Sequence, residues 1–170
     1  MIMAKSYATA YQLRASLTHL CLSSNRDVAC INIMCSRVTL GCACRLAQVL
    51  ENITISSSSL KVIELSNNKL PVLPASLWTC KSVERIDASN NLLEDLGLRS
   101  NIAESNNDDA IIMSVLEEVD LRNNINLTYK AIAPLLLDSK RFPKLSRILL
   151  TRETWQNIAI AYESNKVILC

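Results

Sequence analysis

The sequence predicts an α/β solenoid whose short parallel strands line a concave side and whose helices or extended segments cover the convex side. Apolar residues recur in the order L-x-x-L-x-L-x-x-N-x-L, with clear copies starting at Leu60, Val83 and Leu116. Alternating apolar residues that end at Asn are typical of a strand followed by a turn. Hydrophobic residues make up 49% of the 170 residues but aromatic residues only 4%. The core must therefore be aliphatic, as in proteins built from small stacked repeats.

On these copies, at 60–70, 83–93 and 116–124, the chain resembles leucine-rich repeat proteins. Weaker copies at 28–38 and 145–150 extend the resemblance over about residues 28–152. Successive copies start 32, 23, 33 and 29 residues apart, and the longer values resemble the ribonuclease-inhibitor-like type, which has a full helix in each repeat. The resemblance implies a fold that presents its concave side to other proteins.

An Asn closes each clear copy of the repeat: Asn68, Asn91 and Asn124. It stands where the chain turns away from the sheet. Its side-chain amide has two donors and an acceptor, so it can satisfy backbone groups of its own turn and of the neighbouring turn. We therefore expect a structural ladder of Asn side chains rather than a catalytic role for them.

The N-terminal segment 1–27 is predicted to be a helical cap on the stack. Leu13, Leu17 and Leu20 have helical spacing over residues 5–22, with no helix breaker among them. A rival register places the repeat template from Leu17 to Asn25. It starts only 11 residues before the copy at 28–38, which is too short for a full repeat, so the cap is favoured.

Beyond the strands, the sequence predicts three kinds of convex segment. Helices are expected at 39–52 and 128–138. An extended segment is expected at Leu70–Pro74, because its two prolines lack a backbone N–H donor. A polar insertion at 99–109 is expected either to be solvated or to dock a partner. Residues 153–170 should form a C-terminal cap with a helix near 154–163, since Glu153 stands where the repeat would have Asn.

One position of each predicted strand forms an acidic column on the concave face. The residues between the last two apolar positions are Asn32, Glu64, Asp87, Asp120 and Leu149, and neighbouring strands lie about 4.8 Å apart. The column could accept a basic segment of a protein partner, together with flanking Arg85, Glu118, Arg122 and Arg147. Alternatively, Lys61 and these arginines neutralise the acids and leave an ordinary solvated face.

Composition argues against several classes of site. With only Gly41 and Gly97, the chain lacks glycine-rich phosphate-binding loops, and its single His19 gives little basis for a His-centred site. The seven cysteines are an odd number without C-x-x-C pairs, so they are expected to pack as small apolar residues. A metal or redox role for Cys35, Cys42 and Cys44 is a less favoured alternative. Trp78 and Trp155 are expected in the convex-side core.

The pattern as a whole favours a non-enzymatic protein-interaction or scaffold subunit of a larger hetero-oligomeric complex. It would bind through the concave face, with the convex face or the 99–109 insertion as alternatives. The alternative functions are a regulatory inhibitor, similar to ribonuclease-inhibitor-like proteins, and, least favoured, a hydrolase or metal-dependent enzyme. No cofactor is expected.

The sequence favours a protein partner and a location in the cytoplasm. A net charge of +2 gives no reason to expect a nucleic-acid partner. The sequence has no run of about 18 apolar residues, so no transmembrane segment is expected. A cytoplasmic or cytoskeletal location is expected. The alternative is a mitochondrion or plastid, because residues 1–26 contain no acid and resemble a targeting peptide in composition.

Overall fold

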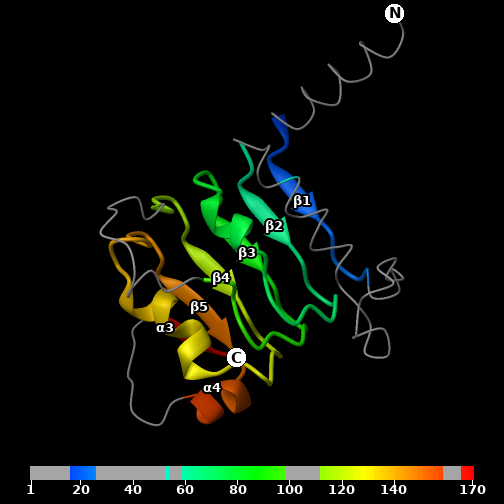
Figure 1. Ribbon diagram of the computed structural model, residues 1–170, viewed down its shortest axis with the longest axis vertical. Coiled ribbons are helices and arrows are strands. Elements are labelled where there is room, and N and C mark those ends of the chain that lie inside the picture. Colours follow the sequence, from blue (N-terminus) through cyan, green and yellow to red (C-terminus); the bar gives the residue numbers. More distant parts are fainter. Residues whose placement is uncertain (1–15, 26–52, 54–58, 99–111, 159–165) are drawn as a thin grey trace, which may run out of the picture.

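The computed structural model describes residues 16–25, 53, 59–98, 112–158 and 166–170. These residues form a six-stranded, all-parallel sheet whose strands follow one another in chain order, as Figure 1 shows. The strands are β1 (His19–Cys21), β2 (Val62–Glu64), β3 (Arg85–Asp87), β4 (Glu118–Asp120), β5 (Arg147–Leu150) and β6 (Val167–Leu169). The described part of the chain thus has the α/β class that the sequence predicts.

One buried aliphatic residue in each of the first five strands sets the register of the sheet. Leu20 aligns with Ile63, Ile86, Val119 and Ile148 across the first five strands, and each of these side chains is buried. Flanking residues point the other way, because side chains alternate between the two faces of a strand. The predicted alignment of the strands in the copies at 60–70, 83–93 and 116–124 is confirmed.

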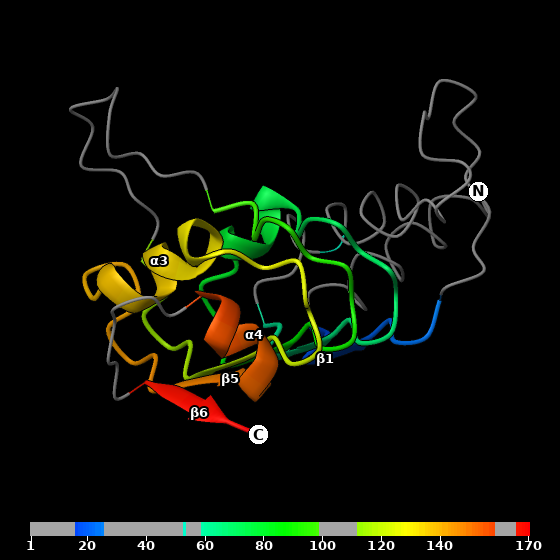
Figure 2. The same ribbon diagram turned by 90° about the horizontal axis from the view of Figure 1, so that it is seen from below.

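A second layer lies across the core from the sheet (Figure 2). Between β2 and β3 the chain forms the short 3-10 helix η2 (Ala75–Thr79), and between β4 and β5 the helix α3 (Tyr129–Leu137). The predicted helix at 128–138 is confirmed, with Ile132 and Leu135 buried. Parallel neighbours in a sheet need such crossover connections.

Two aromatic side chains on this side of the molecule, Trp78 and Phe142, lie in the core. Trp78 on η2 is fully buried and its indole N–H donates to the carbonyl oxygen of Leu96. Its ring meets that of Phe142 edge to face, with 6.1 Å between the centroids. The expected core position of Trp78 is confirmed, and Trp155 is partly buried against the same core.

A ladder of asparagines connects the turns that follow the strands. The Asn91 amide donates to the carbonyl of Leu65 in the preceding turn and to that of Ala88 in its own, and its oxygen accepts the backbone N–H of Asn68. Asn68 and Asn124 repeat the same pair of donations. The three side chains are at most 4% exposed, so the predicted structural role is confirmed.

The residue before each ladder asparagine has a left-handed backbone conformation. Asn67, Asn90 and Asn123 have φ angles of 60°, 53° and 58°. Asn tolerates this region better than most residues with a side chain. The Asn-Asn pairs of the sequence therefore divide two tasks: the first residue reverses the chain and the second makes hydrogen bonds to both turns.

The N-terminal prediction is wrong for residues 19–21, which form strand β1 instead of a cap helix. Leu20 fills the central core position beside Ile63, and the backbone N–H of Asn25 donates to Asn68 Oδ1 at 2.6 Å. Burial and ladder bonds thus outweigh the helical spacing of the segment. The rival register from Leu17 to Asn25 is the correct one, and β1 is the neighbour of β2.

The C-terminal segment agrees in part with its prediction. Helix α4 (Arg152–Ile158) confirms the start of the helix expected near 154–163. The strand β6 was not predicted, because Val167–Leu169 is an isolated apolar run without the repeat. The predicted copy at 28–38, the helix at 39–52, the insertion at 99–109 and most of the segment 1–27 lie outside the described residues.

Every helix in the part of the chain that the structure describes falls short of the length and apolar character needed to span a membrane.

Replacing Gly97 by Ala should destabilise the fold markedly. Gly97 has a φ of +64°, and a Cβ there would overlap the carbonyl oxygen of Leu73. We expect a loss of more than about 1 kcal/mol, the usual cost of a left-handed residue with a side chain. Urea denaturation measures it, with Glu94→Ala at an exposed neighbouring position as the control. A midpoint equal to that of the control would contradict the assigned backbone conformation.

Loss of one rung of the ladder should cost more than loss of an exposed asparagine. Asn91→Ala leaves the backbone N–H groups of Asn68 and Leu70 without the side-chain oxygen that accepts them. It also removes one of the two amide donors to each of the carbonyls of Leu65 and Ala88, which keep those of Asn68 and Asn124. Each buried polar group without a partner costs about 1–3 kcal/mol. Thermal unfolding of this variant should show a clearly lower midpoint than that of Asn126→Ala, an exposed position. Equal midpoints would exclude the ladder as a stabilising element.

Candidate functional site

The face of the sheet that points away from the core carries two rows of side chains, which we call the first row and the second row. The first row runs His19, Val62, Arg85, Glu118 and Arg147 across β1 to β5. The second row runs Cys21, Glu64, Asp87, Asp120, Leu149 and Ile168 across β1 to β6. This outer face includes most of the residues that the sequence predicts as a site.

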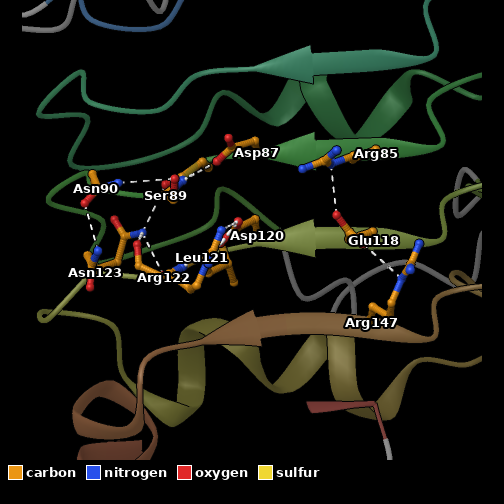
Figure 3. A network of polar contacts seen from close by, with 12 residues as sticks. Arg85, Asp87, Ser89, Asn90, Glu118, Asp120, Leu121, Arg122, Asn123 and Arg147 are labelled. Carbon is orange, nitrogen blue, oxygen red and sulfur yellow. Dashed lines mark hydrogen bonds and ion pairs between the residues drawn. The ribbon is translucent and has the colours of Figure 1, made fainter. Parts of the chain in front are cut away.

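The centre of the first row is an acid held between two arginines (Figure 3). Glu118 accepts from Arg85 Nε at 2.9 Å through Oε1 and from Arg147 Nε at 2.9 Å through Oε2. The side chain of Glu118 is only 11% exposed, whereas each arginine is 51% exposed. The arginines of β3 and β5 therefore fold over β4 and shield its acid from solvent.

The centre of the second row is a fully buried acid that is paired with Arg122. Asp120 Oδ2 accepts from Arg122 Nη2 at 2.6 Å, and Oδ1 accepts from Nε at 3.0 Å and from the backbone N–H of Arg122 at 3.1 Å. The hydrogen bond and negative charge of Asp120 raise the pKa of Arg122 above its ordinary value. A bidentate pair of this kind fixes both side chains.

The other two acids of the second row have much weaker cationic partners. Asp87 Oδ1 accepts the backbone N–H of Ser89 at 3.0 Å, which makes it a turn-forming residue like Asp120. Glu64 Oε1 lies 3.2 Å from Nε2 of His19, a side chain that is 53% exposed. Within the described segments, neither acid forms an ion pair with a lysine or an arginine.

The predicted acidic column thus has the expected register, but its three acids differ in burial and in charge pairing. Glu64, Asp87 and Asp120 are neighbours on three strands, but Asp120 is buried and already neutralised by Arg122. The sequence held a signal for this pair, since Asp-x-Arg places the arginine beside the strand end. Asn32 lies outside the described residues, and Cys21 occupies the corresponding place next to Glu64.

At its far end, the second row is apolar, a feature that the sequence analysis missed in part. Leu149 on β5 is partly exposed and aligns with Ile168 on β6, which is 40% exposed. The sequence has no signal for strand β6, because its residues do not follow the repeat pattern. The second row therefore passes from two acids, through a neutral centre, to two aliphatic side chains.

No cluster of three potential metal ligands occurs among the residues whose placement the structure gives. Cys80 is buried, as expected for a packing role, while Cys21 and Cys170 are exposed. Cys35, Cys42 and Cys44 lie outside the described residues. His19, which was expected on a helix near the surface, lies on β1 and is exposed.

Comparison of the chain with protein families, with curated proteins and with solved structures gave no match.

The pair of buried Asp120 and partly exposed Arg122 should show stronger coupling than a pair in which both side chains are exposed. A double-mutant cycle to Ala should give about 1–3 kcal/mol for this pair, the range for residues in one polar network. The control is the exposed pair of Lys61 and Glu84, with side chains 56% and 45% exposed, for which under about 1 kcal/mol is expected. Denaturant unfolding measures both cycles, and equal couplings would contradict the burial of Asp120.

Proposed function

We propose that the chain is a leucine-rich repeat protein that acts without catalysis, as an interaction or scaffold subunit that binds a protein through its outer face. The observation that carries the proposal is this face itself: a continuous row of strands whose outward side chains are fixed before any partner arrives. Arg85, Arg147 and Arg122 are each held by an acid of β4. Side chains that are already ordered lose little conformational entropy on binding.

In the second row, the charge that has no lysine or arginine partner among the described residues is negative. Glu64 and Asp87 are adjacent in the second row, and like charges on neighbouring strands are unfavourable unless a cation joins them. A basic side chain of a partner would supply that cation. This favours a protein partner with a basic segment that would contact β2 and β3 rather than the whole predicted column.

A regulatory inhibitor is the second candidate, because the same pair of acids could cover the basic site of an enzyme. A scaffold would remain in a complex of several subunits, whereas an inhibitor would bind one enzyme in equal amount and suppress its activity. The identity and stoichiometry of the proteins that co-purify with the tagged chain distinguish the two.

Removal of the two free acids should weaken binding without unfolding the protein. The double variant Glu64→Gln, Asp87→Asn keeps the side-chain shapes, and the new Asn can still accept the backbone N–H of Ser89. We expect about tenfold weaker binding of the co-purified partner, equivalent to about 1.4 kcal/mol, and a smaller dependence on salt. Surface plasmon resonance with the purified complex components would measure both.

The matched control is Glu94→Gln, which removes an exposed acid that follows the turn after β3. It should leave the affinity unchanged. If the double variant binds as tightly as the control and with the same salt dependence, the outer face is not the interaction surface.

A further inference from the structure

From the two ends of the second row we infer that the outer face takes one amphipathic helix of a partner, laid across the strands. The helix would place two basic residues over β2 and β3 and two apolar residues over β5 and β6. This inference rests on the proposed function and specifies the partner's chemistry. Its basis is the change of character along the row, from Glu64 and Asp87 at one end to Leu149 and Ile168 at the other.

The two acids without a lysine or arginine partner, Glu64 and Asp87, lie on adjacent strands beside Cys21 of β1. Asp120, the next member, has both carboxylate oxygens engaged by Arg122. A cationic ligand that ran along the whole row would therefore gain nothing beyond β3. Leu149 and Ile168 present partly exposed aliphatic surface instead. Covering this surface is favourable only with apolar side chains. A partner must therefore carry both kinds of residue, in a fixed order.

The spacing of the row fits a helix. Strands lie about 4.8 Å apart, so the four residues stand at about 0, 4.8, 14.4 and 19.2 Å along the row. A helix rises about 1.5 Å per residue, and its positions i, i+3, i+10 and i+14 fall at about 0, 4.5, 15 and 21 Å on one face. Residues of an extended chain that share one face repeat every 6.6 Å or so. That step exceeds the spacing of the two acids by about 1.8 Å, whereas positions i and i+3 of a helix match it to within about 0.3 Å.

The probes are two helical peptides of identical composition in an alanine and glutamine background. The matched peptide has Lys at i and i+3 and Leu at i+10 and i+14. The control peptide has the same lysines but carries Leu at i+5 and i+9, on the other side of the helix. Fluorescence anisotropy with the full chain measures the dissociation constants.

We expect the matched peptide to bind at least about tenfold more tightly than the control peptide. Glu64→Gln with Asp87→Asn should remove most of this advantage and its salt dependence, and Ile168→Ser should remove a similar part without affecting the salt dependence. Glu94→Gln should change neither value. Circular dichroism of each variant shows that the fold is retained.

Equal binding of the two peptides, or binding of the matched peptide that ignores both substitutions, would overturn the inference. The proposed function is tested separately by the affinity for the native partner. If that affinity still depends on Glu64 and Asp87 while the matched peptide shows no preference, the face binds a protein but not a helix of this kind.

Discussion

The hydrogen bonds of the asparagine ladder are the constraint on which the rest of the structure depends. At each turn the chain leaves the sheet with carbonyl groups that no strand neighbour can satisfy, and buried polar groups without partners are costly. Asn68, Asn91 and Asn124 satisfy these groups for two turns at once. Consecutive turns are thereby held at one spacing, and strands β1 to β4 end at fixed positions.

The outer face inherits its order from this spacing. Once the strands are in register, Glu118 lies between Arg85 and Arg147, and Asp120 lies beside Arg122. Asp87 and Asp120 also accept a backbone N–H two residues later, so the acids that could contact a partner also help to form the turns. On β3, Asp87 would thus serve both the turn and the proposed contact.

The sequence predicts the middle of the chain well and its ends less well, for physical reasons. Between Leu60 and Leu150, every strand centre is an aliphatic residue in a repeated frame, and the frame alone determines which residues are neighbours. The frame is ambiguous near Leu20, where helical spacing and the repeat coincide, and only burial beside Ile63 decides between them. The spacing Asp-x-Arg brings Asp120 and Arg122 to the same strand end, but the complete burial of Asp120 depends on side-chain conformation, which a repeat pattern does not encode.

Among the described strands, contacts of the sheet are made between immediate neighbours in the order β1 to β6. A perturbation at one end therefore reaches the other only through every coil between them. Such linear arrangements lose structure progressively from their ends, so the amides of β1 and β6 should exchange with deuterium before those of β3 and β4. The acids and arginines of β3 and β4 would then remain in place while the ends of the sheet open and close.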